Sequence, residues 1–175
     1  QNKKVLFLDL DQQGNLTYST GASNSDYNAL EELVAGRLQA DKAQLTSSGF
    51  SVIPSTPLLA NVDAVLNQTG KEYRLKEALA DLDSFDFVVM DTPPSLNIIT
   101  INALTASDYA VIPAQADIFS LQGITQLGQT IEAVKRYTNN DLKVLGIVLT
   151  KHNTRSILSR DLQKVITDTA MQLHT

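Results

Sequence analysis

Two aspartates near the start of the chain stand at the carboxyl end of a predicted strand, which is where parallel α/β sheets bind their ligands. Asp9 and Asp11 close the apolar run VLFLDLD, and a glycine-bearing turn, QQGN, follows them. Side chains two residues apart in an extended chain lie on the same side, where these two charges repel. A structural alternative is that the aspartates form turns or cap a helix, and it fits Asp11 better than Asp9.

A third aspartate, Asp91, comes directly after the apolar run FVVM and precedes Thr92-Pro93-Pro94-Ser95. This is the form of a Walker B carboxylate. It suits Mg²⁺, which takes one or two carboxylates alongside water and phosphate oxygens. Because ligands of parallel α/β sheets bind outside the carboxyl ends of the strands, we expect the three aspartates at one edge of a sheet.

The elements that must position these residues are predicted by apolar runs and helical spacing. Near-continuous apolar runs predict strands buried on both faces, at Val5–Leu10, Phe85–Met90, Tyr109–Pro113 and Leu142–Leu149, with a shorter candidate at Phe50–Ile53. Helical patterns occupy Asp26–Leu38, Pro57–Gln68, Tyr73–Leu82, Ile98–Ala106, Leu121–Tyr137 and Ser156–Leu173. The alternation predicts a three-layer α/β fold with a mostly parallel sheet flanked by helices, and we expect residues 1–175 to form a single domain.

The composition narrows the possible chemistry. The chain has 175 residues, 43% of them hydrophobic and 19% charged, which is ordinary for a globular protein. The absence of cysteine excludes disulfide scaffolds, thiolate zinc sites and iron–sulfur clusters from this sequence, and two histidines leave little for a histidine-based site. No apolar run approaches the roughly 20 residues of a membrane span, which predicts a soluble, cytoplasmic protein.

The charge is distributed unevenly along the chain. Residues 1–134 carry 7 Lys and Arg against 16 Asp and Glu, whereas residues 135–175 carry 7 against 3. A basic end on an acidic body suits a surface that meets a polyanion. The alternative is that these charges form solvated helix faces.

The two motifs LDLDQQGN and FVVMDTPPSL resemble those of the ParA/Soj partition ATPases, within the MinD-like group of P-loop proteins with a deviant Walker motif. The resemblance continues through Leu96–Leu104, Ile112–Gln115, Phe119–Gly123, Gly146–Lys151 and Arg155–Arg160. It implies a P-loop NTPase-like fold and an ATP hydrolase with ATP and Mg²⁺ as cofactors.

The resemblance also implies roles for individual residues. Asp11 would orient the attacking water, Asp91 would hold Mg²⁺, and Asp9 would support the same metal and phosphate network. The residues implied in nucleotide binding are Pro93, Thr150, Lys151 and Asn153. Those implied in DNA binding are Lys151, Arg155, Arg160 and Lys164, although Arg160 and Lys164 could equally be surface charges.

The family's partners follow from the same resemblance: an ATP-dependent homodimer, nonspecific DNA and a ParB-like centromere-binding protein, in the cytoplasm at the nucleoid and with no membrane. Two departures are visible. The family usually has proline where Gln12 stands, and no GxxxxGK[ST] loop occurs in the 175 residues. We therefore expect hydrolysis from the intact protein and not from this stretch by itself. The alternatives are a MinD-like, membrane-associated regulator of division-site placement and a non-catalytic scaffold relative.

Overall fold

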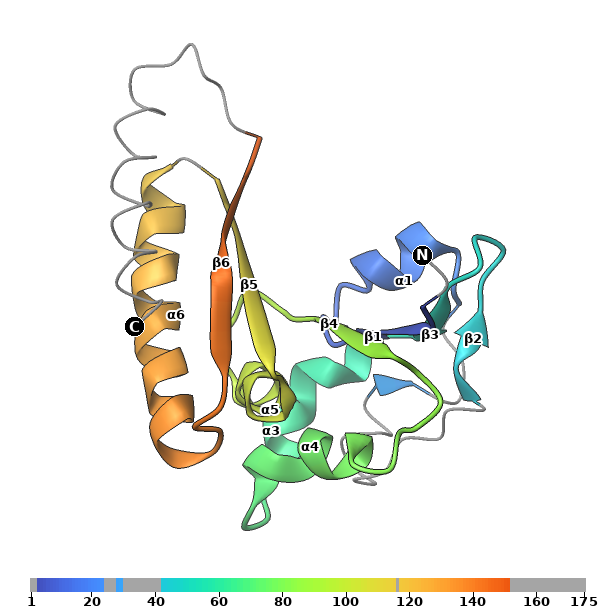
Figure 1. Ribbon diagram of the computed structural model, residues 1–175, viewed down its shortest axis with the longest axis horizontal. Helices are drawn as coiled ribbons and strands as arrows, with labels where there is room; N and C mark the ends of the chain where they lie inside the picture. Colours follow the sequence, from blue (N-terminus) through green and yellow to red (C-terminus); the bar gives the residue numbers. More distant parts are fainter. Residues whose placement is uncertain (1–2, 24–27, 30–41, 116, 152–175) are drawn as a thin grey trace. The chain divides into compact units, whose positions relative to one another are not determined.

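A computed structural model describes residues 3–23, 28–29, 42–115 and 117–151, which belong to two compact units, Gln1–Ala106 and Ser107–Thr175 (Figure 1). The helix expected at Ser156–Leu173 lies outside the described residues, as does that at Asp26–Leu38 except for residues 28 and 29. None of the helices within the described ranges is long and apolar enough to cross a membrane.

The first unit contains a four-stranded sheet in the order β2-β3-β1-β4. Its strands are β1 (Val5–Asp9), β2 (Gln44–Leu45), β3 (Ser51–Ile53) and β4 (Phe87–Asp91). The central strand β1 runs parallel to both β3 and β4, whereas β2 pairs with β3 antiparallel. The three parallel strands therefore end at the same edge of the sheet, as the sequence predicted for the aspartates.

Short helices accompany this sheet in the first unit. They are α1 (Asn15–Thr20), η2 (Pro57–Asn61), α3 (Val62–Val65), η3 (Lys71–Tyr73), α4 (Arg74–Leu79) and α5 (Ile98–Ala106). Leu6 and Leu8 of β1 are fully buried in a core that they share with Leu75 of α4 and Ile99 of α5. Phe7 alternates with them along β1, and its ring meets that of Phe50 edge-on at 5.3 Å. Apolar contacts thus hold the central strand firmly.

One buried amide fixes the helix that follows β4. The side chain of Asn102 in α5 is fully buried. Its Oδ1 accepts a hydrogen bond from the Leu75 amide at 3.0 Å, and its Nδ2 donates to the carbonyls of Lys71 at 2.8 Å and Ile98 at 2.9 Å. These bonds join α5 to η3 and α4. They thereby fix the C-terminal end of the loop that connects β4 to α5.

The second unit pairs two parallel strands, β5 (Tyr109–Gln115) and β6 (Lys143–Thr150), and a long helix, α6 (Ile118–Tyr137), connects them (Figure 1). The Asp117 side chain begins α6 by accepting a hydrogen bond from the Ser120 amide at 2.7 Å. Ladder pairing skips Leu145, so β6 has a bulge at this residue, opposite Ala110 and Val111 of β5, where the register shifts. Buried apolar side chains come from the helix and from both strands: Ile112, Ala114, Ile124, Ile131, Val134 and Val144.

The expected fold class is confirmed, since a mostly parallel sheet is accompanied by helices. The helix at Ile98–Ala106 has the predicted bounds, and the expected helix at Pro57–Gln68 is instead a 3₁₀ turn followed by the short α3. The prediction of strands buried on both faces was wrong for β4, β5 and β6, each of which exposes large apolar side chains: Phe87 (57%) and Val89 (45%) in β4, Tyr109 and Val111 in β5, and Leu145 and Val148 in β6. Along β4, Val88 and Met90 pack against the core, while Phe87 and Val89 lie on the opposite, exposed face, which is the alternation of a strand covered on one face.

Candidate site at the carboxyl edge of the first sheet

The parallel pairing brings Asp9 and Asp91 together at the carboxyl edge of the sheet. They are directly paired in the register of β1 and β4, and the Leu10 amide donates to the Asp91 carbonyl at 2.9 Å. Asp11 follows two residues beyond Asp9. The sequence-based expectation that the three carboxylates share one edge is thus confirmed by the strand register.

The Asp9 carboxylate is fully buried and organises the turn that follows β1. Its Oδ2 accepts hydrogen bonds from the Thr17 amide at 2.7 Å and the Thr17 hydroxyl at 2.6 Å, and its Oδ1 accepts one from the Asp11 amide at 3.2 Å. Asp9, at the end of β1, therefore holds the first turn of α1 in place through its hydrogen bonds to Thr17. The sequence-based prediction that a turn or cap role fits Asp9 poorly was therefore wrong.

Asp11 lies at the start of the turn and is half-buried. Its Oδ1 accepts a hydrogen bond from the Gln13 amide at 3.1 Å, and its carbonyl accepts one from the Gly14 amide at 2.9 Å. Gly14 has φ 63° and ψ 31°, a left-handed conformation that glycine adopts without strain. The turn is therefore closed by its own backbone and leads directly into α1.

Electrostatics single out Asp91 among the three aspartates. Partial burial raises the pKa of its carboxyl, and the negative charges of Asp9 and Asp11 raise this pKa further, while a hydrogen bond from the Thr92 amide acts in the opposite direction. Such concentrated negative charge favours a proton or a cation. A divalent cation beside these carboxylates would remove the repulsion between them.

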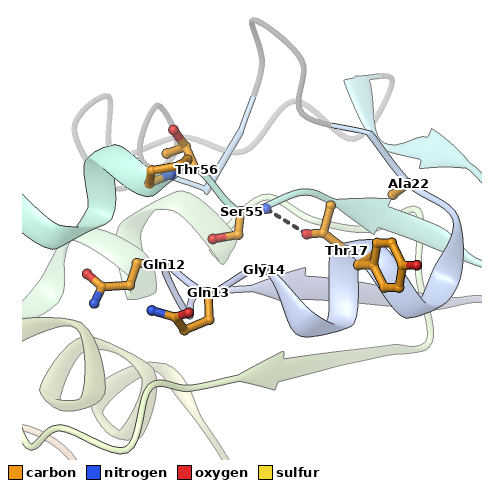
Figure 2. Close-up of a pocket in the computed structure, with 9 residues that line it drawn as sticks. Gln12, Gln13, Gly14, Thr17, Ala22, Ser55 and Thr56 are labelled. Atoms are coloured by element: carbon orange, nitrogen blue, oxygen red, sulfur yellow. Dashed lines mark hydrogen bonds between the residues drawn. The ribbon is translucent and has the colours of Figure 1, made fainter.

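A pocket of about 270 Å³ opens beside the turn, between the residues after β1 and those after β3. Figure 2 shows the side chains of Gln12 and Gln13 on one side and Ser55 and Thr56 on the other. Tyr18, which is 88% exposed, also lines it. Those lining residues that the structure describes carry amides and hydroxyls but no charged side chain, which distinguishes the pocket from the carboxylate edge.

The other sequence-predicted residues fall in different places. Pro93 is half-buried two residues after Asp91 in the first unit. Thr150 ends β6 in the second unit, where its hydroxyl donates to the Ala114 carbonyl at 3.2 Å, and the exposed Lys151 follows with φ 50°. The remaining predicted residues lie outside the described part of the chain: Asn153, Arg155, Arg160 and Lys164.

Sequence reasoning missed two residues that hold the site together, Thr17 and Ser55. Thr17 belongs to the unpredicted helix α1, and Ser55 follows β3. The Ser55 amide donates to the Thr17 hydroxyl at 2.9 Å (Figure 2), and the Ser55 hydroxyl donates to the Asp11 carbonyl. The residues are 38 positions apart, and no local sequence pattern signals such a pairing.

Comparison with known proteins places this geometry in context. Residues 1–144 match the family model of an AAA domain. The chain is 39% identical to the sporulation initiation inhibitor protein Soj of Bacillus subtilis, over 89% of this chain and 64% of that protein. It is 36% identical to the chromosome partitioning protein ParA of Caulobacter vibrioides, over 93% of this chain and 63% of that protein. The chain thus spans less than two thirds of the length of these relatives.

The chain is also similar in fold and sequence to a solved structure of a protein with a different name. The crystal structure of cobyrinic acid a,c-diamide synthase from Mycobacterium smegmatis, with bound ATP analogue and magnesium, has a TM-score of 0.88 and 37% sequence identity. The match covers 96% of this chain and 70% of that one. The similar fold therefore occurs together with a nucleotide and magnesium.

Proposed function

Since the chain belongs to the AAA domain family and, within it, to the ParA/Soj-type partition ATPases, we propose that it hydrolyses ATP to drive the segregation of plasmid or chromosomal DNA. One observation of the structure supports this most strongly. Three aspartates converge at the carboxyl edge of a parallel sheet, and two of their charges raise the pKa of the third. Magnesium-dependent phosphoryl transfer requires such a preorganised acidic edge.

The residues at this edge fit Mg²⁺. No cluster of three or more His, Cys, Asp or Glu side chains with metal-binding geometry exists within the described ranges. Magnesium does not need such a cluster, because it takes one or two carboxylates and completes its shell with water and phosphate oxygens. Asp91 is the residue that would hold it. Asp9 would contribute negative charge, since both its oxygens already accept hydrogen bonds.

Mg²⁺ and Asp11 have separate roles in the proposed reaction. Bound Mg²⁺ would neutralise charge that develops on the transferring phosphoryl group. Asp11 would orient the attacking water and accept its proton, and the turn closed by Gln13 and Gly14 holds its backbone for this task.

Nucleotide and DNA contacts complete the proposal. Pro93, Thr150, Lys151 and Asn153 would contact the nucleotide. Lys151, Arg155, Arg160 and Lys164 would bind the phosphates of DNA without sequence preference, in an ATP-dependent dimer at the nucleoid of the cytoplasm. A ParB-like centromere-binding protein would stimulate hydrolysis. The exposure of Lys151 after β6 is compatible with these contacts.

The magnesium dependence of ATP turnover by the full-length protein tests this proposal. We expect Asp91→Asn to raise the magnesium concentration that gives half-maximal turnover by about 10- to 100-fold, because one charged ligand is lost. The matched control is Asp81→Asn, which makes the same change at an exposed site after α4 and should leave this concentration unaltered. Magnesium-independent turnover would contradict the proposed role of Asp91 in holding the metal. No turnover by the wild-type protein would contradict the proposed ATPase activity and favour a non-catalytic scaffold.

A further inference from the structure

A closed ring of hydrogen bonds underlies the turn that carries Asp11. Asp9 accepts from the amide of Asp11 and from the amide and hydroxyl of Thr17. The Thr17 hydroxyl in turn accepts from the Ser55 amide at 2.9 Å, and the Ser55 hydroxyl donates to the Asp11 carbonyl. Both the amide and the carbonyl of Asp11 therefore take part in the ring.

The ring connects the ends of two neighbouring strands. Asp9 ends β1, and Ser55 follows β3 by two residues. Three of the four members are almost completely buried, with exposed fractions of 0% for Asp9, 5% for Thr17 and 1% for Ser55. Water competes poorly with hydrogen bonds at such positions, so the ring is well placed to hold its geometry.

Within the ring, Ser55 supplies a restraint that the turn does not supply by itself. The bonds from Gln13 and Gly14 to Asp11 are local and move with the turn. Ser55 is 44 residues away from Asp11 in sequence and is anchored by β3. Its hydroxyl therefore ties the Asp11 backbone to a second strand of the sheet.

We propose that Ser55 and Thr17 are positioning residues for hydrolysis, which fix the Asp11 backbone relative to the carboxyl edge of the sheet. This inference rests on the proposed function, in which Asp11 orients the attacking water. Both side chains line the pocket beside the turn. Loss of the Ser55 hydroxyl leaves the Asp11 carbonyl still bonded to the Gly14 amide. The variant should therefore fold, while the turn gains freedom.

The test compares kcat with nucleotide affinity in the full-length protein. We expect Ser55→Ala to lower kcat for ATP roughly 10- to 100-fold with unchanged Kd for ATP, because a misplaced reacting group costs rate and not binding. Thr17→Val should behave similarly, and Thr17→Ser, which keeps the bridging hydroxyl, should restore kcat. Ser19→Ala is the matched control, since the hydroxyl of this exposed serine of α1 donates to the local Leu16 carbonyl and not to the ring. Equal kcat for Ser55→Ala and Ser19→Ala would overturn the inference.

Hydrogen exchange of the Gln13 and Gly14 amides separates this inference from the proposed function. Faster exchange in Ser55→Ala than in Ser19→Ala is expected, because the turn loses its tie to β3. Equal exchange in the two variants would overturn the inference whatever the turnover. Absence of ATP turnover in the wild-type protein would instead refute the proposed function, while faster exchange in Ser55→Ala would still support the tie between the strands.

Discussion

Replacement of Asp9 by asparagine separates the structural and electrostatic roles of this buried carboxylate. The carboxylate receives three donors on two oxygens, at 2.6, 2.7 and 3.2 Å. An asparagine has a single side-chain oxygen, which can keep both Thr17 donors. Its amide group would then face the Asp11 amide, which places one donor against another. Asp9→Asn should therefore weaken the turn and also remove one negative charge beside Asp91.

The magnitude follows from these three bonds. Conversion of two charge-assisted bonds to neutral ones costs about 1 kcal/mol each, and an unmade bond to a buried amide costs about 1–3 kcal/mol. Relief of the repulsion with Asp91 offsets part of this loss. We expect a net reduction of about 2–3 kcal/mol in the free energy of unfolding. Because the Asp9 charge is gone, the pKa of Asp91 should fall toward its ordinary value of 3.8.

Urea unfolding and an NMR titration of the Asp91 carboxyl carbon measure the two effects in one variant. Asp83→Asn, at an exposed position before β4, is the control and should change neither quantity appreciably. A stability of Asp9→Asn equal to that of the wild type would refute the three-bond arrangement. An unchanged pKa of Asp91 would refute the electrostatic coupling.

Three further predictions concern the core, the pH dependence and the basic end. Asn102→Ala should lower the free energy of unfolding by about 3 kcal/mol, since three hydrogen bonds of about 1 kcal/mol each are lost. Urea unfolding of this variant and of the wild-type protein measures the difference. Hydrogen bonds from the Lys4 amide and then from the Lys3 ammonium lower the pKa of Asp86 below its ordinary value of 3.8. The Asp86 carboxylate should therefore stabilise the fold above pH 3.8, and this stabilisation should be lost as the pH falls through the lowered pKa. Unfolding midpoints that respond identically to acid in the wild type and in Asp86→Asn would contradict this prediction. Joint Arg155→Glu and Arg160→Glu substitution should reduce the slope of log K for DNA against log salt by about 2, and an unaltered slope in a binding titration would indicate a solvated surface.

The sequence predicted the fold well where apolar patterns decide it. Parallel strands appear at all five predicted runs. Helix α5 has the predicted bounds because Ile98–Ala106 is rich in apolar residues and Asn97 accepts hydrogen bonds from the Ile99 and Thr100 amides at its start. The convergence of three aspartates could also be predicted, since the carboxyl ends of parallel strands meet at one edge.

Helix α1 could not be predicted in the same way. It spans six residues, NLTYST, of which three are Thr or Ser with modest helix propensity. Glycines with left-handed backbone flank it, and the buried Asp9 holds its first turn through Thr17. Tertiary hydrogen bonds, which no local pattern encodes, thus decide this segment.

The same reason explains the missed positioning residues. In the sequence, nothing distinguishes Ser55 from the other residues of the segment PSTP after a short strand, or Thr17 from its polar neighbours. Their importance depends on a register that brings β3 beside β1. The structural role of Asp9 likewise depends on a helix that the sequence did not reveal.

The rate of ATP hydrolysis by Asp11→Ala in the full-length protein, at saturating ATP and magnesium, tests the central assignment most directly. The assignment of Asp11 as the water-orienting residue predicts a kcat reduced about 10²- to 10⁴-fold, as expected when a group that orients water and accepts its proton is removed. It also predicts that the Kd for ATP stays within about twofold of the wild-type value, because the residues proposed to contact the nucleotide are intact. Wild-type turnover in Asp11→Ala would contradict the account.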